Sequence, residues 1–583
     1  MSSTTQDMPN VENAQVKTVQ AATAAKQWTT MLGLMLGSAL LVFLYCRHMV
    51  NGLVSPDAMD FAQCARNLLQ GHGFVTQILH PLALTHGSNS LHQPDTTHGI
   101  LYPFVLALGF GMFGAKDAVV IAVSSLFYVL TGPLIFLLAR RLFNVRAGWI
   151  AALIFLTNGS ILEYAASGTH ITLFLFLATC LFCTLHGMAG SPPAPGGQEE
   201  APSLPKTSYL LAGILTGLLY LTDPLFLWIV PVMLAAAVRM SPGRPFNALV
   251  WFGLPLLALL VPAMVRFGQL TGNPLFGLRG SELWMGTEML PGLMGYRISP
   301  EHFLADRGTG LSIVRKLLLA AVEGIALIPR MPGSWILLFV APSLVYQYSN
   351  PSATRLRSIL LWCLLTTLVG GLFFSPNPIR LMIVFPALLI FAVAFLQYTL
   401  EAARLKPEKI WAVCAGLGLV LLSPLAGDLI KTRYPVTVEE AGVTRALTKQ
   451  MPAGDVSFSD QPWLVAWYGE RASIWIPVED QSLTDLRQQF PKARWLFLTK
   501  QTPGLSPEWD ETYRGLLQWN QAYRRAQKAN TPLPQSVQIS GSQIPLLKAL
   551  DGFETVPPLH GEGQPLTIVV AEAPASTQKA QLP

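Results

Sequence analysis

The chain has 583 residues, of which 51% are hydrophobic and only 12% are charged. Soluble globular domains carry about 25% charged residues, so this composition excludes a wholly soluble protein and indicates a polytopic α-helical membrane protein with one soluble part. The net charge of +6 is modest and is spread along the chain, which argues against a nucleic-acid-binding surface.

The N-terminal segment is polar and lacks the layout of a cleavable signal peptide. We predict that residues 1–27 form a disordered cytoplasmic tail. The first apolar run is then expected to stay in the mature protein, as the start of a membrane domain over residues 28–430.

Apolar runs recur through this membrane domain. A spanning helix needs about 20 predominantly apolar residues, or slightly fewer. Two doubtful runs, Ile100–Phe113 and Leu317–Ile328, are short and are expected to lie at the interface without crossing. The clear candidates are Trp28–Cys46, Ala118–Leu138, Ala147–Leu162, Ile171–Met188, Tyr209–Leu221, Leu225–Val238, Leu249–Val265, Trp335–Val345, Ile359–Phe374, Leu381–Leu396 and Trp411–Leu422.

The short basic loops between these runs fix the expected orientation, because Lys and Arg favour the cytoplasmic side. If the two doubtful runs do not cross, the chain has about 11 crossings and all of the short basic loops fall on one side. The full range is 11 to 13 crossings. The N-terminus is then cytoplasmic. A first outer loop (47–117), a second outer loop (266–333) and residues 431–583 are extracytoplasmic. The basic residues of the short loops on the cytoplasmic side are Arg140, Arg141, Arg146, Lys206, Arg239, Arg244, Arg355, Arg357, Arg404, Lys406 and Lys409.

The first outer loop opens with an acidic stretch, VSPDAMDFAQCARNLLQGHGF (Val54–Phe74). Ser55 can cap a helix, Pro56 suits its first position, and Asp57 favours the positive end of the helix dipole. We predict a helix that ends at Gly71. Its apolar stripe is typical of a helix that lies along a membrane surface.

Asp57 and Asp60 are three residues apart, so they project from roughly one face of this helix. One interpretation is a solvated helix face. The other is a general base, because two close carboxylates raise the pKa of one of them. Oxygen-ligand binding of Mg²⁺ or Mn²⁺ through either residue also stays open. The histidines of the loop show no zinc-ligand spacing; they are His72, His80, His86, His92 and His98.

The C-terminal part has a different character from about residue 431. Short buried strands alternate with helical stretches, which predicts a small α/β domain over residues 431–583. Its favoured role is structural, or the docking of an acceptor. The predicted strands are Asp455–Phe458, Ser473–Pro477, Trp495–Thr499 and Leu566–Ala571.

The first outer loop also resembles a known family. The run from Asp57 to Gly114, which includes A-R-N-L-L-Q-G-H-G-F and L-Y-P-F-V-L-A-L-G-F-G-M-F-G, is similar to the opening of C-type glycosyltransferases. The similarity is to the family 39 group, related to protein O-mannosyltransferases and bacterial aminoarabinose transferases. Weaker matches are Arg380–Pro386 and Glu163–His170. The family often has adjacent Asp-Glu and a Pro-Pro pair, where this chain has Asp57-Ala58 and His98-Gly99.

The resemblance implies an integral membrane glycosyltransferase of the bacterial cytoplasmic (inner) membrane. It would move a sugar from a polyprenyl-phosphate donor to a hydroxyl of a glycan, lipid or protein acceptor on the extracytoplasmic face, with inversion. Asp57 is the implied general base and Asp60 its helper. The leaving phosphate needs a cation. Expected substrate contacts are Arg380, Arg66, His98 and Glu163, while Arg279 and Arg297 are further candidates for which an interfacial anchor is favoured.

Two other functions fit such a chain. One is a transporter or flippase of lipid-linked sugars. Against it, Asp223 and Glu323 are the main acids within the apolar segments, and no inverted repeat is evident. The other is a non-catalytic membrane scaffold with the same fold.

Overall fold

The computed structural model describes most of the chain. It covers residues 553–555, 567–572 and 10–531, the last apart from 86–91, 190–205, 242–243, 286–294, 296–297, 306–308, 328–336, 375–377, 405–406, 432–435, 438, 453, 478–479, 500, 507–508, 516, 518–524, 526–528 and 530. Arg297, the first residues of the predicted tail and the first residue of the last predicted strand lie outside this part.

Long apolar helices form a bundle. Within the described residues, six are long and apolar enough to cross a membrane, and a pair bent by 55°, α6 (Val145–Thr157) with α7 (Gly159–Ser167), is a seventh candidate. The multi-pass membrane architecture is therefore confirmed, while the count of about 11 crossings stays a prediction. The six are α1 (Asn10–Met49, apolar from Ala25), α5 (Asp117–Leu142), α8 (Ile171–Ala189), α11 (Pro245–Thr271), α15 (Pro351–Phe373) and α16 (Phe385–Ala402).

Every predicted apolar run overlaps a helix, including the runs whose helices are shorter or less apolar. Helix α13 begins eight residues before the doubtful run Leu317–Ile328 and packs against α15. Helix α1 begins at Asn10, so the predicted disordered tail is wrong from that residue onward; the segment holds several alanines and no proline or glycine after residue 10. The remaining helices are α4 (Leu101–Phe113), α9 (Lys206–Thr222), η1 (Pro224–Ile229), α10 (Val230–Arg239), α13 (Thr309–Leu327), α14 (Leu337–Val345) and α17 (Pro407–Lys431).

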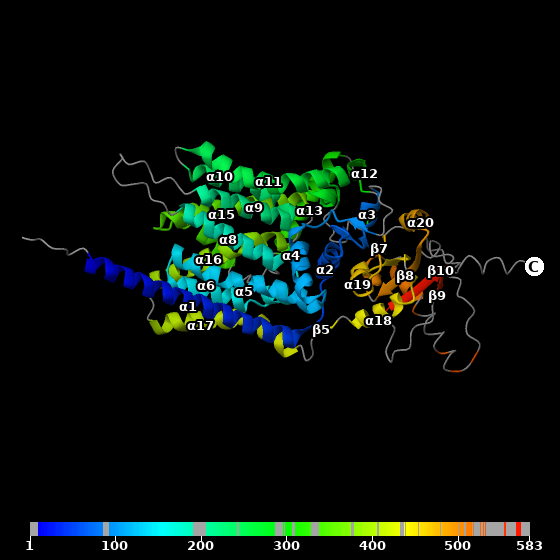
Figure 1. Cartoon of the computed structure of the whole chain (residues 1–583), viewed down its shortest axis with the longest axis horizontal. Helices are drawn as coiled ribbons and strands as arrows, with labels where there is room; N and C mark the ends of the chain where they lie inside the picture. Colours follow the sequence, from blue (N-terminus) through cyan, green and yellow to red (C-terminus); the bar gives the residue numbers. More distant parts are fainter. Residues whose placement is uncertain are drawn as a thin grey trace, which may run out of the picture.

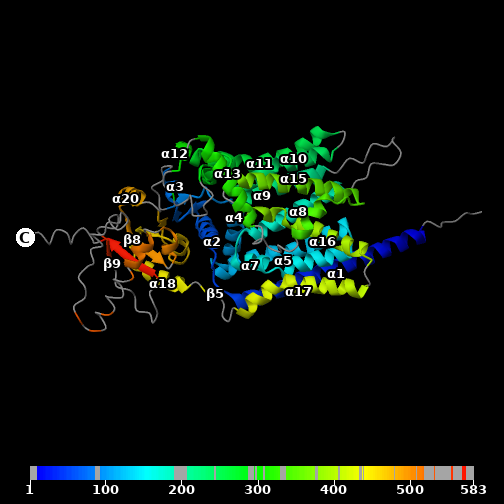
Figure 2. The same ribbon diagram turned by 180° about the vertical axis from the view of Figure 1, so that it is seen from behind.

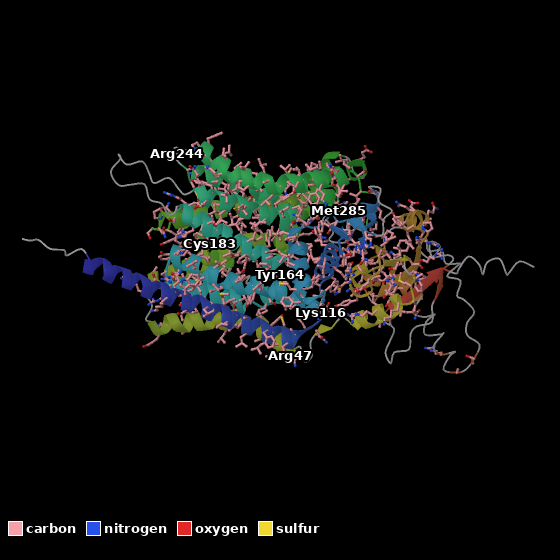
Figure 3. All side chains as sticks on the ribbon, in the orientation of Figure 1. Arg47, Lys116, Tyr164, Cys183, Arg244 and Met285 are labelled. Carbon is pink, nitrogen blue, oxygen red and sulfur yellow. The ribbon has the colours of Figure 1, made fainter. Side chains whose placement is uncertain are left out.

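The two outer loops and the C-terminal domain gather at one end of the bundle (Figures 1 and 2). Helices α2 (Pro56–Leu69), α3 (Pro81–Leu84) and α12 (Pro300–Ala305) lie there. Figure 3 places Arg244 at the opposite end and Met285 near the domain. This arrangement agrees with the grouping of loops that the basic residues predicted.

Helix α2 starts and ends where the sequence predicts, with Pro56 in its first turn and Gly71 just beyond it at φ +81°. Its surroundings differ from the prediction. Instead of lying along a membrane surface, α2 is buried from Ala58 to Asn67 and packs between α4 and α19 (Pro462–Tyr468). Phe61, on the face that the sequence pattern assigned to lipid, packs against the rings of Tyr102 and His170.

The C-terminal domain is built on a six-stranded sheet with the order β3-β7-β6-β8-β10-β9. The pairs β3–β7, β7–β6 and β6–β8 are parallel, and β8–β10 and β10–β9 are antiparallel. The predicted α/β character is thus present. The elements are β6 (Val456–Ser459), α19, β7 (Ser473–Trp475), α20 (Asp480–Gln489), β8 (Ala493–Thr499), β9 (Phe553–Thr555) and β10 (Thr567–Glu572), preceded by α18 (Glu439–Thr448).

One strand of this sheet comes from the first outer loop. Strand β3 (Ile78–Leu79) pairs with β7 in parallel, with Ile78 opposite Ser473 and Leu79 opposite Ile474. Two residues are too few to show a strand pattern, so the sequence did not predict this pairing. A second link is the pairing of β1 (Val50–Asn51) with β5 (Val436–Thr437). The first outer loop and the C-terminal domain therefore form one structural unit.

The orientation of the bundle is tested by reporter fusions on either side of α17. Alkaline phosphatase, which folds only outside the cytoplasm, is expected to be active when fused after Lys431 and inactive when fused after Arg404. Green fluorescent protein should give the reverse pattern at the same two positions. An active phosphatase after Arg404 with an inactive one after Lys431 would contradict the predicted topology.

Candidate functional site

A group of charged side chains, here called the charged cluster, lies at the outer ends of the apolar helices. Four of its members come from the two predicted outer loops. The other three come from segments that are far apart in the sequence. Charge in such a position is costly and marks functional sites. The cluster consists of Asp57 on α2, His98 before α4, His170 before α8, Asp223 before η1, Arg279 and Glu282 on η2 (Gly277–Trp284), and Arg380 on η6 (Pro378–Ile383).

Asp57 is exposed at the N-terminal end of α2. Its carboxylate is near enough to raise the pKa of His98 and of Arg279, and it acts in the same sense on His170. The helix dipole favours the ionised form of a carboxylate in this position. Asp57 therefore presents an accessible negative charge to the rest of the cluster.

Arg279 is fixed between two carboxylates. Its Nη1 is 3.3 Å from Asp223 Oδ1, and its Nε donates to Glu282 Oε1 at 3.1 Å. Burial alone would lower the pKa of Arg279, but Glu282 and Asp223 more than offset it and the pKa is raised. The guanidinium is thus a permanent cation. The sequence favoured Arg279 as an interfacial anchor, whereas the structure places it in the charged cluster.

Arg380 shares the same glutamate but is only partly satisfied. Its Nη2 donates to Glu282 Oε2 at 2.7 Å, and its guanidinium lies 5.5 Å from the centre of the Phe374 ring. The Nε and Nη1 atoms are buried and have no hydrogen-bond partner within the described part of the chain. Buried unpaired N–H groups cost about 1–3 kcal/mol or more for a charged group, so this arrangement favours binding of an anion.

A cavity opens beside Arg380. Two further ring nitrogens on its wall, His170 Nδ1 and Trp228 Nε1, are buried without a partner among the described residues. The cavity therefore has a polar part, to which Asp223 and Thr367 also belong, and a largely apolar remainder. The apolar lining includes Phe174, Leu225, Phe226, Ile229, Phe374 and Ile383.

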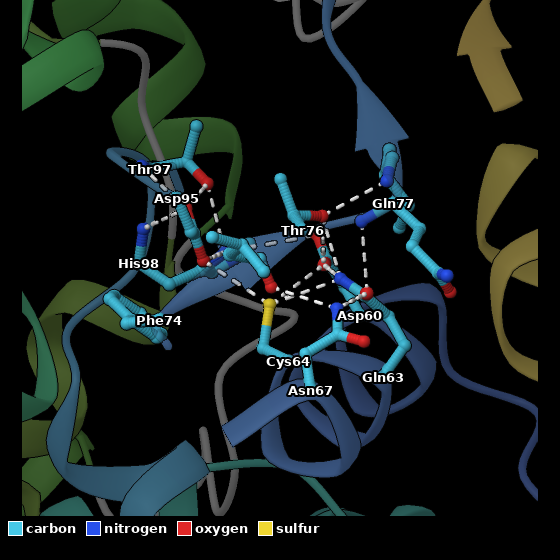
Figure 4. Close-up of polar contacts among 12 residues, drawn as sticks. Asp60, Gln63, Cys64, Asn67, Phe74, Thr76, Gln77, Asp95, Thr97 and His98 are labelled. Atoms are coloured by element: carbon cyan, nitrogen blue, oxygen red, sulfur yellow. Dashed lines mark hydrogen bonds and ion pairs between the residues drawn. The ribbon is translucent and has the colours of Figure 1, made fainter. Parts of the chain in front are cut away.

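Asp60 belongs to a separate buried network, seen in Figure 4. Its Oδ1 accepts hydrogen bonds from Gln63 Nε2 at 2.8 Å and from Thr76 Oγ1 at 3.4 Å. Burial raises the pKa of Asp60 to about 6, and the nearby His98 opposes that rise. Asp60 is buried whereas Asp57 is exposed, so the two carboxylates differ in environment.

His98 joins this network to the charged cluster. Its Nδ1 lies 3.0 Å from Asp95 Oδ2 and 3.7 Å from Asp60 Oδ2. Burial alone would lower the pKa of His98, but Asp95 and Asp60 raise it to about 9. His98 in turn holds the pKa of Asp95 well below its usual range, against the effect of burial. The imidazole is therefore a cation at neutral pH, flanked by two carboxylates.

Asp57 and Asp60, the predicted metal ligands, are close enough for Asp57 to raise the pKa of Asp60. The Asp60 oxygens already face Gln63, Thr76 and His98, and the exposed Asp57 does not join that network. Across the described residues, no group of three or more His, Cys, Asp or Glu side chains is arranged to hold a metal. The positive charges in the cluster come from protein side chains.

Two of the predicted substrate contacts lie elsewhere. The Arg66 Nη1 donates to Trp467 O at 3.0 Å and its Nη2 to Ala466 O at 2.6 Å, with the guanidinium 5.1 Å from the centre of the Trp467 ring. These contacts tie α2 to α19, which favours a structural role. Glu163 is exposed on α7, outside the charged cluster as defined above. Substrate binding by either residue stays a prediction.

The sequence missed how much of the cluster comes from the later part of the chain. Asp223 stood out only as an acid in an apolar segment, and Glu282 carried no motif. The unusual feature of Asp223 is its position directly before Pro224, where it accepts a hydrogen bond from Leu225 N as a helix cap. That local role gives no hint of the ion pair with Arg279 in the next loop.

Comparison with known proteins adds a fold assignment. No protein-family model and no curated sequence matches the chain. The archaeal oligosaccharyltransferase AglB from Archaeoglobus fulgidus superimposes with a TM-score of 0.52 at 12% identity, over 81% of this chain and 69% of that chain. The chain has the C-type glycosyltransferase fold. This confirms the fold that the resemblance of the first outer loop implied.

Two other membrane glycosyltransferases align less closely. ArnT from Cupriavidus metallidurans gives a TM-score of 0.38 at 14% identity, covering 94% of this chain and 98% of that chain. The mycobacterial arabinofuranosyltransferase AftD gives a TM-score of 0.46 at 14% identity, covering 92% of this chain and 41% of that chain.

The raised pKa of His98 predicts a pH-dependent stability. A pKa of about 9 in the folded protein against 6.5 for an ordinary histidine corresponds to on the order of 3 kcal/mol. Because the folded-state pKa is raised, this contribution is complete below pH 6.5 and is lost as the pH rises through 9. Asp60, with a pKa of about 6, is largely ionised throughout that window.

Thermal unfolding of the purified protein between pH 6 and 10 measures this effect. The wild-type midpoint should fall between pH 6.5 and 9, and His98→Gln should flatten that fall. His72→Gln, which changes an exposed histidine of the same loop, should keep the wild-type profile. An unchanged pH profile in His98→Gln would refute the assignment of the charge to this histidine.

Proposed function

We propose that the protein is an integral membrane glycosyltransferase that moves a sugar from a polyprenyl-phosphate donor to an acceptor hydroxyl on the extracytoplasmic face. The observation that carries this proposal is the buried Arg380, which lines a largely apolar cavity and has two N–H groups without a partner among the described residues. A lipid phosphate has the two properties that such a cavity requires, a long apolar chain and an anionic end. In support, AglB was solved in complex with a dolichol-phosphate.

The donor would place its isoprenoid chain against the aromatic wall and its phosphate at the polar end. Arg380 Nε and Nη1, Trp228 Nε1 and His170 Nδ1 supply the donors that such a phosphate would accept. Hydrogen bonds from guanidinium to phosphate are charge-assisted and about twice as strong as neutral ones. Arg279, held by Asp223 and Glu282, adds a fixed positive charge nearby.

Asp57 is the proposed general base. Its carboxylate takes the proton of the acceptor hydroxyl while the hydroxyl oxygen bonds to the anomeric carbon of the sugar. The bond from that carbon to the phosphate oxygen breaks, and the lipid phosphate leaves with the electron pair. Arg380 and Arg279 stabilise the charge that develops on it. A single displacement of this kind inverts the anomeric configuration.

The remaining parts of the assignment follow from the arrangement of the loops. A glycan, lipid or protein acceptor would approach from the side of the C-terminal domain, because this domain packs directly on α2 behind Asp57. We place the protein in the bacterial cytoplasmic membrane with this end outside. In this proposal the positive charge at the leaving phosphate comes from Arg380 and Arg279.

Asp57→Asn tests the proposed base. Transfer of sugar from a polyprenyl-phosphate sugar should fall by roughly 10²- to 10⁴-fold, the usual contribution of a general base, with the unfolding midpoint unchanged. Glu408→Gln, which neutralises an exposed acid on α17, is the matched control and should retain full activity. Assays with EDTA, and with Mg²⁺ or Mn²⁺ added back, report on the metal separately.

The same assay, applied to the wild-type protein, separates the alternative functions. A transporter or flippase of lipid-linked sugars should give no transferase activity in the wild type, and a scaffold should give neither transfer nor lipid-linked-sugar movement. Full transfer by Asp57→Asn would show that another residue is the base.

Arg380→Gln tests the donor site. Hydrogen bonds to charged groups contribute about 1.5–3 kcal/mol each, so the Kd of a fluorescent polyprenyl phosphate should rise roughly 10- to 100-fold. Arg146→Gln, which changes an exposed arginine on the basic side of the bundle, should bind as the wild type does. Equal affinity in the Arg380→Gln variant would remove the main support for the proposed function.

A further inference from the structure

A second cavity lies at the junction of the membrane domain and the C-terminal domain. Its walls are β1 and Gly52, which directly follow α1, together with the start of α5 and parts of α18 and α19. Figures 1 and 2 both show β5 and α18 beside this end of the bundle. None of its lining residues borders the cavity at Arg380, so it is distinct from the proposed donor site.

The two charged side chains on its wall, Asp117 and Arg445, differ in whether they are free to contact a ligand. Both carboxylate oxygens of Asp117 are engaged, one by Trp467 Nε1 at 2.7 Å and the other by the Tyr468 hydroxyl at 3.0 Å. Arg445 is exposed, and its guanidinium lies 4.8 Å from the centre of the Tyr468 ring. That ring contact leaves the N–H edge of the guanidinium open to a ligand, whereas Asp117 on the same wall keeps its negative charge but has both oxygens occupied by hydrogen bonds.

The remainder of the cavity is suited to a molecule with an apolar part. Ala118 and Ile121 of α5 contribute an apolar portion of its wall. Large apolar side chains stand exposed on the neighbouring α1, where Phe43 is 64% and Leu44 is 55% exposed. Such side chains at a membrane-spanning helix face lipid. The exposed Arg47 and Lys116 at the same end add positive charge (Figure 3).

We propose that this cavity binds an anionic glycerophospholipid of the outer leaflet, such as phosphatidylglycerol. Its phosphodiester would contact Arg445, and its acyl chains would lie along the exposed apolar face of α1. Because α18 and α19 belong to the C-terminal domain, a lipid bound there would bridge this domain to the membrane. The proposal is independent of the sugar-transfer reaction, since no residue of the charged cluster takes part.

Thermal unfolding of the full-length protein in detergent, with added phosphatidylglycerol, tests this site. The lipid should raise the unfolding midpoint of the wild type, and Arg445→Gln should lose at least half of that rise. Arg494→Gln changes an exposed arginine on β8 that does not border the cavity and should keep the full response. Phosphatidylcholine and inorganic phosphate are run as separate titrants.

A second variant fills the cavity without removing charge. A Cβ atom added at Gly442, which lines the cavity, meets no atom within 4 Å, and replacing a helical glycine favours the helix. Gly442→Leu should therefore fold stably and still lose the phosphatidylglycerol response. An equal response in the wild type and both cavity variants would overturn the proposal. So would a full effect of inorganic phosphate alone or of phosphatidylcholine.

Discussion

The site depends on one carboxylate that serves two guanidinium groups. Glu282 accepts from Arg279 with one oxygen and from Arg380 with the other. A single carboxylate cannot saturate both cations, and a charge buried at the end of apolar helices is stable only when it is paired. Asp223 completes the pairing of Arg279, whereas two N–H groups of Arg380 have no partner within the described part of the chain. The polar end of the cavity is a result of this shortage of acceptors.

A second electrostatic unit holds the first outer loop against the helix bundle. His98 lies between Asp95 and Asp60, and the Phe61 ring is within 4.6 Å of the His98 ring and 4.9 Å of the His170 ring, centre to centre. Through these contacts the buried side of α2 is positioned relative to α8. The exposed Asp57, one turn earlier on α2, is thereby aimed at the cluster without itself being part of the buried network.

Local signals in the sequence were enough to predict the helices and strands, but not which residues the fold brings together in the charged cluster. Pro56 and Gly71 marked both ends of α2, because both residues act through backbone geometry that does not depend on the rest of the fold. The acidic motif led to Asp57 by family resemblance. The ion pairs of Glu282 join residues up to 98 positions apart, and no periodicity records such a contact. The apolar face of α2 was read as a lipid-facing surface because burial against protein and against lipid select the same residues.

The strand that the first outer loop lends to the C-terminal sheet affects how the protein is made. Ile78 pairs with Ser473, so the sheet edge at β7 is completed only by a segment that lies 395 residues away in the sequence. Parallel pairings over such distances form slowly, and open edges invite aggregation. During synthesis, the inner face of α2 stays uncovered while the remaining helices are inserted. Soluble expression of residues 431–583 alone would leave β7 as an unprotected edge, so a stable fragment needs residues 78–79 supplied as an added strand.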